Sequence, residues 1–307
     1  MADNLTPPAP GVQWAVMARS TFRRGCWSSF LFLLALLAVL ATAAVTCSIL
    51  LAPAAPRTIL VLGLDRRPDE TGPVRSDTML LIAVRPDVPR VALLSIPRDL
   101  YVEVPGHGQS RINTAHFFGG PALAAETVAR NFGVPVDRWA RLDFNGFRAI
   151  VDAAGGVDID VPRRIVDKAY PTEDYGVMRI EFPAGPQHMD GETALRYVRT
   201  RHGSSDFDRA ARQQQVVLAL VRQLLHPSAW PRWPAVAQAF IQSVETDLQP
   251  WDILALLPTL VRVGPEGIQH AVINAEMTTP FTTPSGGQVL LPRWERIRPL
   301  VQEVVGP

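Results

Sequence analysis

The chain has very few cysteines, with two among its 307 residues, Cys26 and Cys47. Both lie in or beside a long apolar stretch near the N-terminus. A helix that rises about 1.5 Å per residue would hold them roughly 30 Å apart, far beyond the reach of a disulfide. No cysteine follows residue 47, so the rest of the chain has neither a disulfide framework nor a thiol nucleophile.

The chain also lacks a strong net charge and several familiar catalytic motifs. Its 30 basic and 29 acidic residues give a formal net charge of +1, so no global field favours nucleic acid or another polyanion. The sequence contains no G-x-S-x-G, no P-loop and no H-E-x-x-H motif. Its six histidines do not have the spacing of metal ligands. A polyanion site must therefore be local, and nucleic acid is not an expected partner.

Apolar residues are abundant near the N-terminus. Residues 26–56 contain no charged side chain, and about 20 apolar residues suffice to cross a bilayer. Arg19, Arg23 and Arg24 precede this run, so the positive-inside rule puts the N-terminus in the cytoplasm. A cleaved signal peptide is the alternative, although its apolar region usually has only about 7 to 15 residues. We expect a single-pass protein of the cell membrane with a cytoplasmic tail (1–25), a transmembrane signal-anchor helix (26–52), a linker (53–57) and an extracytoplasmic domain (58–307).

Three apolar runs of strand length follow the linker, at residues 58–64, 78–84 and 91–96. Because each is apolar on both faces, they suit a sheet that is covered on both sides. Helical and strand-like segments then alternate, an order typical of α/β proteins. The expected helices are 121–132, 147–155, 190–199 and 206–225, and the further strands are 139–144 and 156–161. We predict an α/β domain with a central mixed β-sheet covered by helices on both faces, and an irregular surface excursion over residues 163–188.

Charged side chains stand where the first three predicted strands begin or end. Asp65 follows the first strand, Arg75 and Asp77 open the second, and Arg98 follows the third. In open α/β sheets, ligands bind at the ends of strands. If the first two strands pair antiparallel, Asp65 and Asp77 meet at one edge, where two carboxylates suit Mg²⁺ or Mn²⁺ that also keeps waters and phosphate oxygens. The alternative is ordinary salt bridging between strand ends.

A second group of polar and basic side chains joins two predicted helices. It comprises Arg199, Arg201, Arg209, Arg212 and Gln213. Arginines at a helix N-terminus oppose the macrodipole and, beside free N–H groups, favour an anion. Because guanidinium forks match phosphate oxygens, phosphate or pyrophosphate is the expected ligand. The alternative is a surface helix whose arginines pair with Asp206 and Asp208 of the same helix.

Seven short motifs follow one another between residues 58 and 225. They are LGLDRR, RSDTMLLIAV, LLSIPRDLYVEVPGHG, RINTAH, GGVDIDVP, MDGETALRYVRTR and DFDRAARQQQ. In this order they resemble the LytR-CpsA-Psr (LCP) family, whose members attach glycopolymers to the bacterial cell wall. An apolar segment directly ahead of the domain is also similar to that family.

The resemblance implies a phosphotransferase that moves a glycopolymer, with one phosphate, from polyprenyl (undecaprenyl) pyrophosphate to a hydroxyl of peptidoglycan. Asp65 and Asp77 match the family's Mg²⁺-binding aspartates. The residues that match its pyrophosphate-binding side chains are Arg75, Arg98, Arg199, Arg201, Arg209 and Gln213. Arg111 stands where the family usually has lysine, which keeps the charge and alters the geometry. We expect Asp77 also to orient the attacking hydroxyl, with Arg75 and Arg98 acting on the reacting phosphate.

Two other functions would use the same residues. With water as the acceptor, the chain would be a polyprenyl-pyrophosphate pyrophosphatase. Binding without turnover would make it a membrane sensor or attenuator of lipid-linked phosphate. The expected partners are therefore a polyprenyl-pyrophosphate-linked glycopolymer, a peptidoglycan acceptor and the cytoplasmic membrane, with Mg²⁺ or Mn²⁺ as cofactor. Transfer fits the residues because phosphoryl chemistry depends mainly on positioning and charge neutralisation.

Overall fold

The computed structural model describes residues 55, 57–65, 72–172, 176–200 and 206–306, and Pro53–Pro307 form one compact unit. The tail and transmembrane helix expected at 1–25 and 26–52 lie outside the described residues. Within the part that the structure describes, no helix combines the length and apolar character needed to cross a bilayer.

A six-stranded mixed sheet forms the centre of the unit, in the order β11-β6-β1-β2-β3-β12. Its strands are β1 (Arg57–Leu64), β2 (Ser76–Arg85), β3 (Arg90–Ser95), β6 (Arg138–Asp143), β11 (Val244–Thr246) and β12 (Gln269–Val272). Strand β2 pairs antiparallel with β1 and β3, β11 pairs antiparallel with β6, and the β1–β6 and β3–β12 pairs are parallel. The predicted mixed sheet is therefore confirmed.

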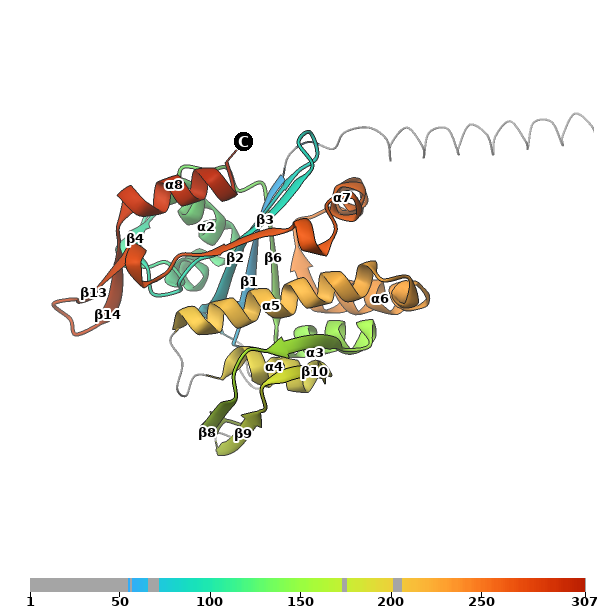
Figure 1. Ribbon diagram of the computed structural model, residues 1–307. Coiled ribbons are helices and arrows are strands. Elements are labelled where there is room, and N and C mark those ends of the chain that lie inside the picture. The colour runs from blue at the N-terminus through green and yellow to red at the C-terminus, as the bar shows by residue number, and fades with distance from the viewer. Residues whose placement is uncertain (1–54, 56, 66–71, 173–175, 201–205, 307) are drawn as a thin grey trace, which may run out of the picture. The chain divides into compact units, whose positions relative to one another are not determined.

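Helices cover both faces of this sheet (Figure 1). On one face, α2 (Thr114–Phe132) and α8 (Trp294–Val304) pack against a core that includes Leu60, Leu62 and Leu81. On the other, α5 (Asp206–Leu225) and α7 (Pro250–Val263) pack against Leu80 and Leu93. Because side chains alternate along a strand, consecutive apolar residues supply both cores. This is why the three central strands read as continuous apolar runs.

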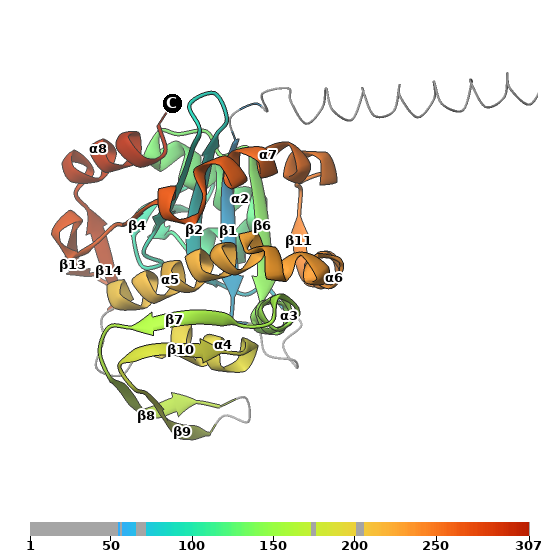
Figure 2. The ribbon, with the colours of Figure 1, turned by 45° about the vertical axis from the view of Figure 1, so that its right-hand side comes forward.

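A second group of elements lies beyond one end of the sheet, at the bottom of Figure 2. It consists of β7 (Val157–Val161), β8 (Ile165–Pro171), β9 (Val177–Phe182), β10 (Gly185–Met189) and α4 (Gly191–Arg199), with α3 (Phe144–Ala154) and α5 beside it. The irregular excursion predicted for 163–188 is wrong, because β8 and β9 form an antiparallel hairpin and β10 pairs with β7. In β9, exposed Arg179 and Glu181 alternate with buried Ile180 and Phe182, a strand pattern too short to stand out among the surrounding polar residues and prolines.

Several helix boundaries follow directly from local sequence. The Asp190 carboxylate accepts a hydrogen bond from the backbone N–H of Thr193 and caps α4 as predicted. Gly155 ends α3 in the left-handed conformation. Helix α2 begins earlier than predicted, at Thr114, and is broken at Gly119 and Gly120. At Gly120 the backbone has φ 69° and ψ −163°, a region that glycine adopts without steric strain.

The remaining elements extend the sheet and cover it. Strands β4 (Tyr101–Val104) and β5 (Gly108–Arg111) form a hairpin, as do β13 (Thr278–Thr282) and β14 (Gln288–Pro292). Three short 3₁₀ turns are η1 (Pro227–Arg232), η2 (Pro265–Gly267) and η3 (Ala275–Met277), and α6 (Trp233–Ser243) leads into β11. Residues 245–307 thus complete the fold, with β12 as an edge strand and α8 over the core.

Candidate functional site

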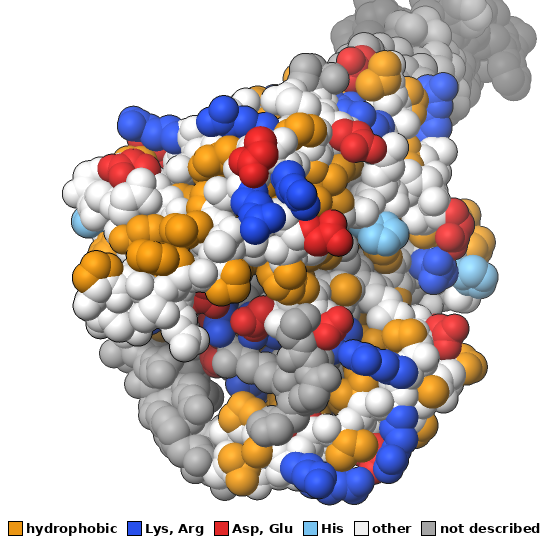
Figure 3. All heavy atoms as spheres, turned by 60° about the vertical axis from the view of Figure 1, so that its left-hand side comes forward, with side chains coloured by type: hydrophobic (Ala, Val, Ile, Leu, Met, Phe, Trp, Pro, Cys, Tyr) orange, Lys and Arg blue, Asp and Glu red, His pale blue; other side chains and the backbone are white. Residues whose placement is uncertain are grey.

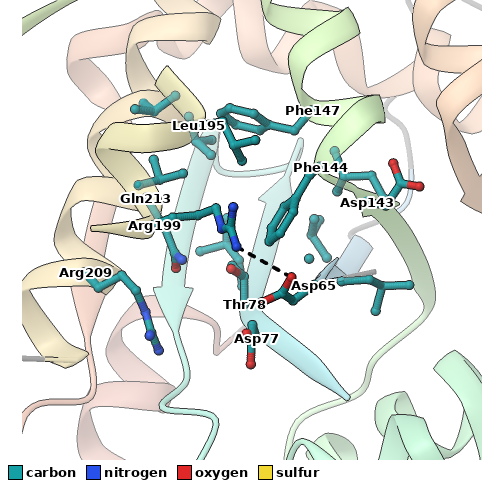
Figure 4. Close-up of a pocket in the computed structure, with 18 of the residues that line it drawn as sticks. Asp65, Asp77, Thr78, Asp143, Phe144, Phe147, Leu195, Arg199, Arg209 and Gln213 are labelled. Carbon is teal, nitrogen blue, oxygen red and sulfur yellow. Dashed lines mark ion pairs between the residues drawn. The ribbon is translucent and has the colours of Figure 1, made fainter. Parts of the chain in front are cut away.

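A hollow opens on the face of the molecule shown in Figure 3, and acidic and basic side chains gather inside it. A pocket of about 290 Å³ lies where the end of β1 and the start of β2 meet α3, α4 and α5. Figure 4 shows Asp65 and Asp77 toward one end of this pocket, with Phe147 and Leu195 at the other. The pocket therefore has a charged mouth and an apolar interior.

The pairing of β1 with β2 brings the two aspartates to the mouth. Leu64 is the last residue of β1 in register and pairs with Ser76, after a shift at Gly63 and Leu64. Asp65 and Asp77 follow directly and both line the pocket. Because the paired residues Leu64 and Ser76 directly precede Asp65 and Asp77, the two aspartates lie at the same edge of the sheet. The expectation that antiparallel pairing of β1 with β2 brings them together is confirmed.

Arg98 reaches the mouth from the end of β3. Its Nη1 lies 2.5 Å from Oδ1 of Asp77, and its Nε lies 3.4 Å from Oδ2 of Asp99. Burial disfavours the charge on this guanidinium, but Asp77 and then Asp99 outweigh that effect and raise its pKa above the usual value. Arg98 is therefore a fixed, permanently charged group beside Asp77.

Arg199 closes the same side of the pocket from the end of α4. Its guanidinium lies 4.0 Å above the ring of Phe144 and donates a 3.2 Å hydrogen bond to the hydroxyl of Tyr170. Its Nη2 lies 3.7 Å from Oδ1 of Asp65, a contact marked in Figure 4. Burial raises the pKa of Tyr170, although Arg199 opposes the shift. A neutral phenol and an aromatic face thus hold this arginine in place.

Of the three α5 side chains singled out from the sequence, two lie at the pocket and one lies elsewhere. Arg209 is buried, lines the pocket and pairs with Asp206 at 2.9 Å, and Gln213 lines the pocket one turn later. Arg212 is buried too, but it donates hydrogen bonds to the carbonyl oxygens of Tyr197 and Thr200 at 3.1 and 2.5 Å. The grouping of Arg212 with the anion site is wrong, because this side chain fixes the end of α4 against α5.

Most of the pocket interior is apolar, apart from Thr78, Ser95 and Gln214. Its lining comes from β1 and β2 (Val61, Leu80), from β6 and α3 (Leu142, Phe144, Phe147, Ile150, Val151), from α4 (Leu195, Val198) and from α5 (Val216, Val217, Leu220). Such a cavity suits a hydrocarbon chain, and its charged mouth suits a phosphate group.

The aspartates fit the way that Mg²⁺ is held in many phosphoryl-transfer sites. Within the described residues, no group of three or more His, Cys, Asp or Glu side chains is placed to hold a metal ion. Mg²⁺, however, commonly takes only one or two carboxylates and completes its shell with water and substrate phosphate oxygens. Asp65 and Asp77 would supply the two carboxylates if Mg²⁺ binds here.

Comparison with known proteins agrees with this geometry. A sequence model of the LytR_cpsA_psr family matches residues 42–287. The chain belongs to the LytR-CpsA-Psr family. It is 36% identical over 226 residues to the polyisoprenyl-teichoic acid–peptidoglycan teichoic acid transferase TagU of Halalkalibacterium halodurans, a match that covers 73% of this chain and 71% of that protein.

Other LytR-CpsA-Psr relatives are matched over less of their length. TagU of Oceanobacillus iheyensis is 34% identical over 207 residues, which cover 65% of this chain and 61% of the relative. TagV of Bacillus subtilis, another polyisoprenyl-teichoic acid–peptidoglycan teichoic acid transferase, is 32% identical, and the match covers 66% of this chain and 52% of the relative.

Solved LytR-CpsA-Psr structures share the fold. The crystal structure of B. subtilis TagV superimposes with a TM-score of 0.67 at 28% identity, over 81% of this chain and 97% of that one. The structure of TagT bound to LIIa-WTA superimposes with a TM-score of 0.66 at 26% identity, over 82% of this chain and 91% of that one.

The site residues predicted from the resemblance to the LytR-CpsA-Psr family are not all at the pocket. Asp65, Asp77, Arg199, Arg209 and Gln213 line it, and Arg98 contacts Asp77. Arg75 is exposed and directly precedes β2, two positions ahead of Asp77. Arg201 lies outside the described residues.

Arg111 occupies a different position from the other predicted arginines. It lies at the end of β5, with its Nε 3.3 Å from Oδ1 of Asp99. Its guanidinium also donates two hydrogen bonds to the carbonyl oxygen of Gln288, at 3.1 and 2.7 Å. Arg111 is thus joined to Arg98 through a shared carboxylate, and it also fixes β14, so its role in phosphate binding stays a prediction.

Sequence reasoning missed the residues that position Arg199. Phe144 begins α3 and Tyr170 lies in β8, in segments read as a strand end and as an irregular excursion. Asp143 was also missed; it lines the pocket and accepts a hydrogen bond from the backbone N–H of Gly146, capping α3. The one available signal was the sequence Asp-Phe-Asn-Gly after a strand, which is typical of a helix start.

Proposed function

We propose that this chain is a membrane-anchored, Mg²⁺-dependent transferase that moves a glycopolymer from a polyprenyl pyrophosphate carrier to peptidoglycan. The observation that carries the proposal is a pocket that combines a charged mouth with an apolar interior. A polyprenyl pyrophosphate has the same division, with an anionic head and a hydrocarbon tail. The names of the matched relatives, teichoic acid transferases that act between a polyisoprenyl carrier and peptidoglycan, support the same activity.

The arginines at the mouth would hold the pyrophosphate. Arg98, Arg199 and Arg209 reach the pocket or its aspartates from three different elements, β3, α4 and α5. Guanidinium groups bind phosphate oxygens through paired hydrogen bonds. Since two of these arginines already rest against Asp65 or Asp77, they are oriented before the ligand arrives, and less side-chain entropy is lost on binding.

In the proposed reaction, an acceptor hydroxyl of peptidoglycan attacks the phosphorus atom that carries the glycopolymer. A new oxygen–phosphorus bond forms, the bond to the bridging pyrophosphate oxygen breaks, and polyprenyl phosphate leaves with the bonding electrons. Asp77, held by Arg98, would orient the hydroxyl and take its proton. Mg²⁺ held by Asp65 and Asp77 would neutralise the charge on the phosphate oxygens.

Anchoring in the membrane is part of this proposal. Residues 26–56 contain no charged side chain, which suits a helix that crosses the bilayer. The substrate's polyprenyl tail also lies in the bilayer, so an anchored enzyme meets its donor in two dimensions. The tail would leave the bilayer and enter the apolar interior of the pocket.

The experiment follows transfer by the purified full-length chain from a polyprenyl-pyrophosphate-linked oligosaccharide to peptidoglycan fragments. We expect release of polyprenyl phosphate that requires Mg²⁺, stops with EDTA and falls by about two orders of magnitude or more in Asp77→Asn. The control is Asp87→Asn, in the exposed turn at the other end of β2. Release that is equally fast without the acceptor would indicate a pyrophosphatase, and tight binding without release would indicate a sensor.

A further inference from the structure

Large apolar side chains are exposed along one continuous stretch of the chain, the segment from η1 through α6 to α7. Among the described residues, eleven large hydrophobic side chains are exposed, and six of them belong to this segment. They are Trp230 (58% exposed), Trp233 (42%), Ile241 (78%), Trp251 (63%), Leu254 (52%) and Val261 (60%). We call these six residues the tryptophan face. Figures 1 and 2 both place α6 and α7 on the side of the molecule away from β13 and β14.

The tryptophan face is poor in charge as well as rich in apolar surface. No charged residue occurs between Arg232 and Glu245, or between Asp252 and Arg262. No residue of α6, all of which the structure describes, is buried, although the helix is mostly apolar. A helix that is apolar and yet unburied lacks the packing that normally stabilises it. Exposed apolar surface of this kind marks an interaction site.

The position where the chain enters the unit identifies the partner. Strand β1 begins at Arg57, whose Nη2 lies 3.6 Å from Oδ1 of Asp252 in the first turn of α7. Trp251 is the neighbour of Asp252 in that turn. Only the four residues 53–56 separate Arg57 from the proposed transmembrane segment, a length of about 13 Å when extended. If residues 26–52 cross a bilayer, the start of α7 must lie close to the bilayer surface.

We infer that the tryptophan face rests in the interfacial layer of the bilayer that holds the anchor. Tryptophan is enriched at that depth, because its ring is apolar while the layer still contains water and headgroups. At Trp233 the indole N–H donates to the carbonyl oxygen of Leu224 at 3.0 Å, so its exposed part is the hydrocarbon of the ring. This inference rests on the anchoring in the proposed function.

The docking would also give the lipid tail a short route into the pocket. Val61, Leu80 and Val217 line the pocket and belong to the same apolar cluster as Leu256 and Leu260 of α7. Strand β11, at one edge of the sheet, joins the two helices of the tryptophan face. Val244, next to α6, pairs with Leu142 near the mouth end of the sheet, whereas Asp252 of α7 contacts Arg57 and Arg138 at the opposite end. The tryptophan face thus runs along this edge from the point where the chain enters the unit to the level of the mouth, and the apolar cluster connects α7 to the pocket interior.

A depth measurement on the full-length chain in vesicles tests the inference. In a background with Cys26→Ser and Cys47→Ser, an environment-sensitive fluorophore is attached at Ile241→Cys or Leu254→Cys. Matched labels at Val177→Cys and Phe281→Cys, exposed by 69% and 44% on β9 and β13, serve as controls. The vesicles contain phosphatidylglycerol and phosphatidylethanolamine, with a nitroxide at the headgroup or along the acyl chain.

We expect nitroxide lipids to quench the α6 and α7 labels several-fold more than the control labels. Equal quenching at all four positions, or none at any, would overturn the inference. Quenching that instead follows protein concentration, with no effect of the nitroxide, would show that a second copy covers the face. A chain that does not float with the vesicles would also overturn it, because the argument begins at the anchor.

A second measurement separates this inference from the proposed function. Transfer is measured from a full-length donor embedded in vesicles and from a short-chain donor in solution. With Trp230, Trp233 and Trp251 all replaced by Gln, we expect the ratio of the first rate to the second to fall about tenfold or more, since interfacial contact is lost. An unchanged ratio would contradict the membrane role. If neither donor reacts with the wild-type chain, the proposed function fails, while the depth measurement still decides the position of the face.

Discussion

Blocking the apolar interior of the pocket should shorten the lipid that the protein can hold. Val217 lies on α5, lines the pocket and is only partly buried. Replacing it by tryptophan puts an indole ring into a space of about 290 Å³. Overpacking a full core costs about 1 to 3 kcal/mol of stability, but here the larger side chain has an open cavity to occupy. We therefore expect Val217→Trp to fold and to lose space for the tail.

The size of the effect follows from the hydrocarbon that the indole displaces. Burial of one CH₂ group contributes about 0.8 kcal/mol, so the five carbons of an isoprenoid unit contribute at most about 4 kcal/mol. Drug-sized ligands gain only about 0.3 kcal/mol per atom, which gives about 1.5 kcal/mol for the same unit. Each unit held by the wild-type pocket should therefore tighten binding by between about tenfold and several hundredfold.

The assay measures the affinity of geranyl, farnesyl and geranylgeranyl phosphate by calorimetry, a series in which each member adds one isoprenoid unit. For the wild type we expect affinity to rise along the series. For Val217→Trp we expect the rise to stop at least one unit earlier, with the shortest ligand least affected. The control is Ala211→Trp, on an exposed position of the same helix. An unchanged dependence on chain length in Val217→Trp would refute the assignment of the interior to the tail.

Three further predictions concern single side chains. Arg98→Ala should weaken pyrophosphate binding by about tenfold to a hundredfold, and Arg98→Lys should restore only part of it, while the melting temperature of both stays near that of the wild type. Asp252→Asn should lower the free energy of unfolding by about 2 to 4 kcal/mol in urea titrations, because it leaves two arginines without their buried partner. Burial raises the pKa of Asp252, but the Gln249 amide and Arg138 outweigh this effect and lower the pKa overall. The difference in unfolding free energy between the wild type and Asp252→Asn should therefore be complete above the ordinary carboxyl pKa. It should vanish as the pH falls through the lowered pKa of Asp252 in the folded protein. Gly191→Ala should cost about 1 to 3 kcal/mol, since its Cβ would lie 2.4 Å from a carbonyl oxygen of α3, whereas Gly72→Ala, with open space around it, should change the urea midpoint little.

The sequence predicted the parts of the fold that are fixed by strong local patterns. Strands β1, β2 and β3 are apolar on both faces, and α5 has the 3.6-residue periodicity of an amphipathic helix over 206–225, the range observed. Antiparallel pairing of β1 with β2 was a hypothesis from the sequence, and the observed register confirms it. Once β1 paired antiparallel with β2, the charged residues Asp65 and Asp77 had to come together.

The sequence did not predict features that depend on packing between distant segments. Arg209 and Arg212 lie three positions apart on α5, but one lines the pocket and the other bonds to the end of α4. Which of the two points inward depends on how α4 lies against α5. The same limit applies to Val216 and Val217, since a pocket lining and a closed core have the same composition. Only the arrangement of the helices leaves a cavity between them.

The charges at the mouth lead to a final prediction about metal binding. Arg98 contacts Asp77 and Arg199 lies beside Asp65, so Mg²⁺ alone must compete with two arginines for its carboxylates. A pyrophosphate group alone must likewise compete with two carboxylates for its arginines. When both bind, the arginines turn to the phosphate and the carboxylates to the metal, and no buried charge is left unpaired. We expect farnesyl pyrophosphate to raise the affinity for Mg²⁺ about tenfold or more, with the reciprocal effect that linkage requires. Calorimetric titration of Mg²⁺ with and without this ligand measures the coupling; the titration is corrected for the Mg²⁺ that the free ligand binds. Equal Mg²⁺ affinities with and without farnesyl pyrophosphate would show that the arginine–carboxylate pairs at the mouth do not exchange partners.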